Sequence, residues 1–223
     1  MGRYGPTTNG LVGWWQFDED SGTSTADNSG NGDTGTLQNS PTWTTGKYSG
    51  ALDFSGTNQY VSVADANFLD LTNGSVAAWI KRDTSGAWHS IVAKGGSNNN
   101  YDHNYGFEIR DTNVLLCAVG DGVSGGHAAV LNTTATISTG TWYHVACTWD
   151  GSTMRIYING AESVNGSQSG LVPAANTSPL YIGQFGGNTD RFDGLIDDVR
   201  VYNRALSAQE VADLYTGFGS SCP

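Results

Sequence analysis

The stretch Asp193–Val211 reads DGLIDDVRVYNRALSAQEV, and its two halves carry different periodicities. Apolar and polar residues alternate over 195–202, which is typical of a strand with one buried face. Two adjacent carboxylates, Asp197 and Asp198, stand in the middle of this strand. Because successive strand residues point to opposite faces, one of the two aspartates should point with the apolar set. A carboxylate in that position is costly unless it finds a partner.

A short helix is predicted directly after the strand. Ser207 is a good N-cap and Glu210 stands three residues later, so the two form the pattern of a capping box. Leu206 before the cap and Val211 after it are placed for a hydrophobic staple. We expect the helix to end at Gly217, because glycine readily adopts the backbone conformation of a helix C-terminus.

The rest of the chain consists of short alternating runs separated by turn residues, with no linker-like stretch and no internal repeat. The clearest segment, residues 140–166, holds two hairpin dipeptides, Asp150-Gly151 and Asn159-Gly160. These residues tolerate positive φ at little cost and therefore favour tight turns. The segment predicts a meander of three antiparallel strands, within an all-β chain that forms one domain.

The composition agrees with an all-β sandwich and limits the classes of partner. The chain has 223 residues, of which 31 are glycine, and 38% are hydrophobic but only 14% charged. A formal net charge of −11 repels phosphate backbones, so nucleic acid is not an expected partner. No run approaches the roughly 20 apolar residues of a membrane span, so we expect no membrane insertion.

The first ten residues contain no apolar segment of the kind found in a signal peptide. A secreted protein with this sequence would have lost its signal, be a piece of a longer chain, or never have used one.

Three cysteines, Cys117, Cys147 and Cys222, are too few and too scattered for a disulfide framework or a zinc site. Cys117 and Cys147 both lie in apolar runs with the pattern of strands. The sequence favours two buried thiols, and a Cys117–Cys147 bridge stays open if the two strands are neighbours.

Motifs spread over nearly the whole chain resemble those of one family. They are, in order, LVGWWQFDEDSG, DNSGNGDTGTL, GKYSGALDFSGTNQYVSV, SVAAWIK, GTWYHVACTWDGSTMRIYINGA, LYIGQ and FDGLIDDVRVYNRALSAQEV. Their order and spacing resemble the LamG-like jelly-roll domains of the concanavalin A-like lectin/glucanase superfamily.

The resemblance implies a two-sheet antiparallel jelly-roll sandwich, with one sheet concave and the first and last strands adjacent. One short C-terminal helix completes the expected fold. We place this domain at residues 11–217, after an N-terminal arm of residues 1–10 and before a C-terminal tail of residues 218–223.

Members of the family commonly hold a structural calcium ion (Ca2+) between the first strand and the last. The matching positions here are Asp18 and Asp197, with Asn39 as a third candidate ligand and Asn31 or nearby backbone carbonyls behind it. Calcium takes six to eight oxygens from carboxylates, carbonyls and water. Such an ion would remove the cost of an inward-pointing aspartate and would tie the termini together.

The sequence contains no EF-hand loop, so any calcium site must be assembled from distant segments. In the alternative interpretation no metal is present, and Asp197 accepts backbone amides or pairs with Arg200 or Arg204. A chelator separates the two, because only a bound ion stabilises the native state by linkage.

Aromatic and polar residues also gather in segments outside the shared motifs. Sugar recognition uses planar polar groups that bind hydroxyls, beside aromatic rings on which a sugar stacks. The expected ligand-binding residues are Trp88, His89, Tyr101, His103, Tyr105 and His127. The alternative is that these segments are hydrophilic loops at the edges of the sandwich.

Catalytic motifs of the superfamily are not found in the sequence. Its hydrolases carry paired carboxylates in a strand motif of the type E-x-D-x-E, whereas Glu108 stands alone in GFEIR. The strand motifs of the jelly-roll lyases and the nucleophile motif G-x-S-x-G are missing as well.

We therefore expect a non-catalytic carbohydrate-binding or adhesion module, lectin-like and extracellular, whose partner is a glycan. The alternative is a structural protein of a virion or cell-surface assembly, which would pack on neighbouring subunits. The missing signal peptide favours that alternative. A glycan hydrolase or lyase ranks third, because its motifs are missing.

Overall fold

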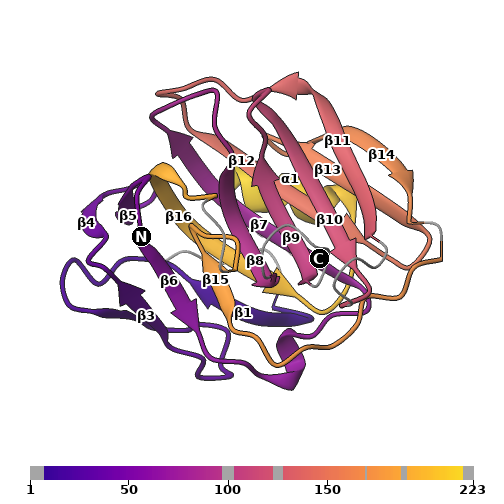
Figure 1. Cartoon of the computed structure of the whole chain (residues 1–223), viewed down its shortest axis with the longest axis horizontal. Coiled ribbons are helices and arrows are strands. Elements are labelled where there is room, and N and C mark those ends of the chain that lie inside the picture. The colour runs from indigo at the N-terminus through magenta and orange to yellow at the C-terminus, as the bar shows by residue number, and fades with distance from the viewer. Residues whose placement is uncertain (1–7, 97–102, 123–127, 169, 187–189, 218–223) are drawn as a thin grey trace, which may run out of the picture.

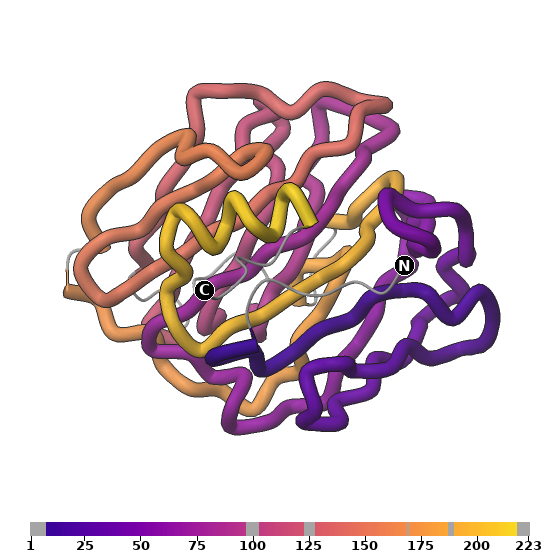
Figure 2. Tube along the Cα trace, turned by 180° about the vertical axis from the view of Figure 1, so that it is seen from behind, coloured from indigo at the N-terminus to yellow at the C-terminus, as the bar shows by residue number. Residues whose placement is uncertain are grey.

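The computed structural model describes residues 8–96, 103–122, 128–168, 170–186 and 190–217. These residues form two antiparallel sheets of eight strands each, packed face to face (Figure 1). The α-helix of the described residues lies against the outer face of one sheet (Figure 2). The predicted jelly-roll sandwich with one short C-terminal helix is confirmed.

Sheet A contains the first and last strands of the fold. Its order is β14-β13-β12-β7-β16-β5-β4, and β1 pairs with β16 as well. The strands are β1 (Leu11–Trp15), β4 (Thr42–Thr45), β5 (Gly50–Ser55), β7 (Gly74–Arg82), β12 (Tyr143–Trp149), β13 (Thr153–Ile158), β14 (Ala161–Ser167) and β16 (Asp193–Tyr202). The predicted three-stranded meander is β12-β13-β14, and Asn159 and Gly160 turn between its last two strands with φ of 51° and 79°.

Sheet B lies towards the viewer in Figure 1. Its order is β11-β10-β9-β8-β15-β6-β3-β2. The strands are β2 (Ser24–Thr25), β3 (Gly35–Gln38), β6 (Tyr60–Val63), β8 (His89–Gly95), β9 (His103–Ile109), β10 (Val114–Gly120), β11 (Ala128–Thr136) and β15 (Leu180–Ile182). A 3-10 turn, η1 (Asn67–Leu69), lies between β6 and β7.

The main core fills the space between the sheets, and a disulfide crosses it. Cys117 on β10 of sheet B is bonded to Cys147 on β12 of sheet A, with their Cα atoms 6.2 Å apart. The interpretation that favoured two buried thiols is wrong. The two strands are not neighbours in one sheet but face each other across the core, a relation that the spacing of the cysteines does not reveal.

Helix α1 (Ala208–Thr216) begins and ends as predicted. The Ser207 hydroxyl accepts a hydrogen bond from the Glu210 amide, and the Glu210 carboxylate accepts one from the Ser207 amide at 2.8 Å. Leu206 and Val211 both join a second, smaller core between α1 and the outer face of sheet A. Gly217 ends the helix in the left-handed region, with φ of 71°. Among the described residues, no helix combines the length and apolar character that a membrane crossing requires.

The first and last strands are adjacent, as the resemblance implied, because β1 pairs with the C-terminal half of β16. The end of the predicted N-terminal arm continues this pairing, because the Asn203 amide, just after β16, donates to the Gly10 carbonyl, just before β1, at 2.8 Å. Residues 1–7 of the arm and the tail 218–223 lie outside the described residues.

Candidate functional site

A β-bulge in β16 explains the two adjacent aspartates. The strand pairs with β5 as far as Ile196 and with β1 from Val199 onward, and its register against β7 shifts between Asp197 and Arg200. Asp198 has a φ of 52° within this bulge. The extra residue lets Ile196 and Val199 both face the main core. The expectation that one aspartate points with the apolar set is therefore wrong.

Both aspartates are buried on the outer face of sheet A. Asp197 stands opposite Trp79 in register, and the Trp79 ring stacks on a tyrosine of α1 at 5.6 Å. Asp198 accepts a hydrogen bond from Trp14 Nε1 at 2.6 Å, and a guanidinium nitrogen of Arg200 lies 3.2 Å from its carboxylate. The hydrogen bond from Trp14 therefore links β1 to β16 beside the helix.

Asp197 and Asp18 hold one turn between them, which runs from Gly46 to Gly50. The Asp197 carboxylate accepts from the Tyr48 amide at 2.8 Å, and Asp18 accepts from the Gly50 amide at 2.9 Å. A Cβ on Gly46 would lie 2.0 Å from the Gly50 carbonyl oxygen and 2.7 Å from Asp197 Oδ2. Carboxylate and carbonyl oxygens thus converge where β16 changes partner from β5 to β1.

The other two predicted calcium ligands lie elsewhere. The Asn31 amide donates to a backbone carbonyl of β1 at 2.9 Å, and the Asn39 amide donates to one in the turn between β5 and β6 at 2.7 Å. Within the described ranges, no three His, Cys, Asp or Glu side chains form a metal-binding group. A calcium ion would have to rely on Asp18, Asp197 and backbone carbonyls, a donor set that suits this cation.

The outer face of sheet B has a floor of small residues. Ala93, Gly106 and Ala118 stand in register on β8, β9 and β10. Phe185, from the segment that follows β15, packs on this floor, because a Cβ on Gly106 would lie 2.9 Å from its Cε2. The segment returns to the sandwich where the Phe192 amide donates to the carbonyl of Gly183 at 3.0 Å.

A row of polar side chains runs beside that floor. Ser90, Glu108 and Asn132 stand in register on β8, β9 and β11, with Leu116 on β10 between the last two. Ser90 is 0% and Glu108 6% exposed, and Ser90 Oγ and Glu108 Oε1 have no hydrogen-bond partner in the part of the chain that the structure describes. Burial, and then the charge of Asp190, raise the pKa of Glu108 to about 8. Glu108 is therefore mostly protonated at neutral pH.

Half-buried aromatic rings flank the row. Tyr60 on β6 and Tyr181 on β15 meet edge to face at 5.9 Å, and the Arg191 guanidinium lies 5.8 Å from the Tyr60 ring centroid. On the other side, the Arg110 guanidinium lies 5.0 Å from the centroid of the Trp88 ring. Arg191 Nη1 and Arg110 Nε are buried and make no hydrogen bond within the described residues.

We call this surface the sheet B site. It consists of Tyr60, Trp88, Ser90, Glu108, Arg110 and Arg191. Its groups can donate and accept hydrogen bonds beside rings on which a planar or ring-shaped ligand can stack.

Of the ligand-binding residues expected from the sequence, the structure brings Trp88 to this site. His103 is 2% exposed, at the start of β9, where its ring meets Phe185 edge to face at 5.3 Å. Tyr101 and His127 lie outside the described residues. Of these four, Trp88 is the one that the structure places in the sheet B site.

The structure corrects the expectation for Tyr105 and His89. Tyr105 is 1% exposed in the main core, with its ring 5.3 Å from that of Trp149. His89 is also 1% exposed and packs against Phe192, whose ring centroid is 5.9 Å away. Both rings therefore pack with the core between the sheets and not with the side chains on the outer face of sheet B.

The sequence patterns did not indicate Tyr60, Arg110 or Arg191 as site residues, and they showed Glu108 only as a lone carboxylate. The one available signal was alternation, which leaves Tyr60 on the face of β6 opposite to Val61 and Val63. Alternation shows that a side chain leaves the core but not which other side chains it meets.

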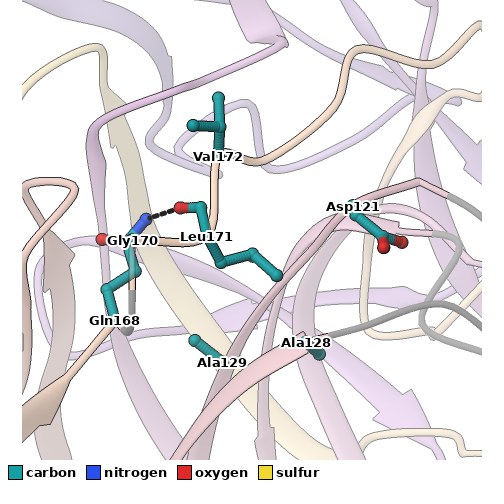
Figure 3. Close-up of a pocket in the computed structure, with 7 residues that line it drawn as sticks. All are labelled: Asp121, Ala128, Ala129, Gln168, Gly170, Leu171 and Val172. Atoms are coloured by element: carbon teal, nitrogen blue, oxygen red, sulfur yellow. Dashed lines mark hydrogen bonds between the residues drawn. The ribbon is translucent and has the colours of Figure 1, made fainter.

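A separate cavity of about 480 Å³ opens between β11 and a segment that contributes Gln168, Gly170, Leu171 and Val172 (Figure 3). Ala128, Ala129 and Leu171 give it an apolar lining. The Gln168 side chain already accepts from a backbone amide and donates to the Leu171 carbonyl, both at 2.8 Å. Its amide needs no ligand, so this cavity is not assigned a function.

Comparison with protein families and curated proteins identifies relatives. Residues 55–212 match the family model described as the concanavalin A-like lectin/glucanases superfamily. The chain is 26% identical over 175 residues to the Adhesion G-protein coupled receptor V1 of Danio rerio. That alignment covers 74% of this chain but 3% of the receptor, so the chain spans a small part of this relative.

Several solved structures share the fold. The binding domain of Paraclostridial Mosquitocidal Protein 1 has a TM-score of 0.76 at 20% identity, over 93% of this chain and 52% of that one. Domain 4 of AbnA, a GH43 extracellular arabinanase from Geobacillus stearothermophilus solved with arabinotriose, has a TM-score of 0.73 at 22% identity. It covers 92% of this chain and 98% of that one. At these identities the likeness establishes the fold.

Proposed function

Because the chain belongs to the concanavalin A-like lectin/glucanases superfamily, we propose that it is a non-catalytic module that binds a glycan at the sheet B site. One observation supports this most directly: buried polar atoms without protein partners lie beside half-buried aromatic rings. Each buried polar group left without a hydrogen bond costs about 1–3 kcal/mol. Hydroxyl groups of a bound glycan would satisfy them and offset that cost.

The hydrogen-bonding groups of the site match the chemistry of sugar hydroxyls, which both donate and accept. Arg110 and Arg191 donate, Ser90 donates and accepts, and protonated Glu108 does both. Tyr60 and Glu108 stand on β6 and β9, three strand spacings apart in the sheet order. At about 4.8 Å per spacing, this is roughly 14 Å, enough for more than one sugar ring.

Two of the comparisons are consistent with a binding function outside the cell. The AbnA domain was solved with arabinotriose, and the toxin relative is named as a binding domain. An extracellular location also agrees with the Cys117–Cys147 disulfide, because disulfides persist in oxidising compartments. The curated relative is named as an adhesion receptor.

Affinity electrophoresis against plant, algal and bacterial polysaccharides tests the proposal. We expect one class of polysaccharide to retard the native chain, and Tyr60→Ala or Trp88→Ala to weaken binding about tenfold, or ~1.4 kcal/mol, through lost stacking. Trp43→Ala is the matched control, because Trp43 is a half-buried tryptophan on β4 of sheet A.

Equal retardation of the native chain and of both site variants would place the glycan elsewhere on the protein. Retardation by no polysaccharide would contradict the glycan proposal and favour an assembly protein that packs on neighbouring subunits.

We also propose a structural calcium ion at the Gly46–Gly50 turn, held by Asp18, Asp197 and backbone carbonyl oxygens. The close approach of Gly46 to the Gly50 carbonyl and to Asp197 Oδ2, where no Cβ fits, supports it. An ion there would neutralise the carboxylates and link β1, β5 and β16. Asn31 and Asn39 are left out of this set, because they lie at other turns.

Removing calcium should lower the melting temperature by several degrees, because the ion binds only the native state. Asp197→Asn should reproduce this loss, with little further change when chelator is added. Asp198→Asn is the matched control, since it removes the neighbouring carboxylate charge that pairs with Arg200 but should keep the response to chelator. A native melting curve that excess chelator leaves unchanged would contradict the calcium proposal.

A further inference from the structure

We propose that the sheet B site selects glycans with a free amino group, and that Ser90, Glu108 and Asp190 receive the ammonium group. The inference rests on the proposed function, since it names the class of glycan that this site takes. An ammonium group has three N–H donors and no acceptor. The three side chains offer a hydroxyl oxygen and two carboxyl groups as acceptors.

The geometry brings these acceptors to one place. Ser90 and Glu108 are directly opposite each other on β8 and β9, so their Cβ atoms are about 4.5–5.5 Å apart on one face. Both side chains are more than nine-tenths buried, and Ser90 Oγ and Glu108 Oε1 find no partner in the described part of the chain. Asp190 comes from the segment after β15, close enough for its charge to raise the pKa of Glu108.

Glu108 lacks a counter-charge among the described residues, unlike the buried groups Lys94 and Asp198. Buried Lys94 has Asp65 at 2.7 Å and Asp70 at 3.1 Å, and buried Asp198 has a guanidinium nitrogen at 3.2 Å. No ion pair reaches Glu108 from any described Lys or Arg residue. An ammonium group on the ligand would supply the missing positive charge.

Two guanidinium groups of the site, those of Arg110 and Arg191, limit the negative charge of the cluster, so the site suits a monovalent cation better than a divalent one. Burial raises the pKa of the Asp190 carboxyl. The positive charge of Arg191, the next residue in the chain, opposes that rise. A divalent ion would need more negative charge than this set provides. The net charge of −11 adds a long-range attraction for polymers that carry many amino groups.

The binding of an amino sugar should release a proton from Glu108. With a pKa of about 8, the free carboxyl is protonated in about 0.9 of the molecules at pH 7. An ammonium group within hydrogen-bond distance favours the ionised carboxylate, so the proton leaves on binding. A neutral glycan exerts no such pull, and its binding should release none.

Isothermal titration calorimetry of the native chain tests this with two probes of equal length, glucosamine oligomers and fully N-acetylated glucosamine oligomers. The measurement is made at pH 7 in two buffers of different protonation enthalpy. We expect the glucosamine oligomer to bind at least tenfold more tightly, with a buffer-dependent enthalpy that reports proton release from Glu108 after correction for protons taken up by the oligomer's amino groups.

Glu108→Gln should abolish both the preference and the proton release, and Ser90→Ala should weaken the preference. Glu162→Gln is the matched control, because Glu162 is a partly exposed carboxylate on β14 that pairs with Arg155. It should leave both quantities unchanged.

Equal affinity for the two oligomers would overturn the inference, and so would a preference or a proton release that persists in Glu108→Gln. The glycan proposal would still stand if a neutral polysaccharide binds and Tyr60→Ala weakens it. If neither oligomer nor any polysaccharide binds, the proposed function fails, and this inference with it.

Discussion

Replacing Glu108 by Gln should stabilise the protein at neutral and alkaline pH. Burial and Asp190 raise the pKa of this carboxyl from 4.5 to about 8 in the native state. Between these values the unfolded chain binds fewer protons than the native chain, so the native protein loses stability as the pH rises. The loss accumulates at up to about 1.4 kcal/mol per pH unit, which is on the order of 3 kcal/mol at pH 7.

An uncharged glutamine does not titrate, so the variant escapes this loss. Its free energy of unfolding should equal that of the native chain near pH 4 and exceed it by on the order of 3 kcal/mol at pH 7. Above pH 8 the difference between the two proteins should stay nearly constant. Urea denaturation from pH 4 to pH 9 measures the difference. Glu162→Gln is the control at a partly exposed carboxylate. Parallel curves for the native chain and Glu108→Gln would show that the carboxyl is not held protonated.

The predicted destabilisation, once measured, would be an argument for a binding role. A buried glutamate that lacks a partner is unfavourable for folding, and a sequence selected for stability alone would not keep it. The glycan that we propose would account for the cost, because it would supply the partner that Glu108 lacks among the described residues.

Loss of the Cys117–Cys147 disulfide should have an effect of similar size in the opposite direction. The bond joins residues 30 positions apart, and closing such a loop removes about 3–4 kcal/mol of chain entropy from the unfolded state. The Cys117→Ala, Cys147→Ala double variant should therefore unfold at a much lower urea concentration. The double variant and the reference protein that keeps Cys117 and Cys147 both carry Cys222→Ala, so that no third thiol can react.

Reduction during unfolding provides the independent check. With a reductant present, the chain that keeps both cysteines should lose about the same stability, whereas the double variant should not respond. Both sulfurs are buried, so a native sample should keep its bond until it unfolds. Equal stability with and without the bond would contradict the entropic argument.

The local features of the fold were predicted well. The capping box of Ser207 and Glu210 and the turn at Asn159-Gly160 are present as expected. Each depends on residues within a few positions of each other, so the sequence alone contains the required information. The pairing of the first and last strands followed from the resemblance.

The candidate site was predicted only in part, because strand ends and bulges decide which way a side chain points. The sequence interpretation placed Tyr105 among ligand-binding residues outside the shared motifs, but β9 begins at His103, so Tyr105 falls on the inward face of a strand. The bulge at Asp198 shifts the alternation of β16 by one residue and sends both aspartates to the outer face. No pattern in the sequence predicts the start of β9 at His103 or the bulge at Asp198.

The sequence by itself determined the all-β class, the C-terminal helix and the strand meander, because periodicity, caps and turns act between near neighbours. The tertiary structure decided that Cys117 meets Cys147 across the core, and that Glu108 lies opposite Ser90 on one face, where the charge of Asp190 raises its pKa. The physical reason is that disulfide pairing, burial and pKa depend on strand register and on the facing segment. These are set only when distant parts of the chain pack together.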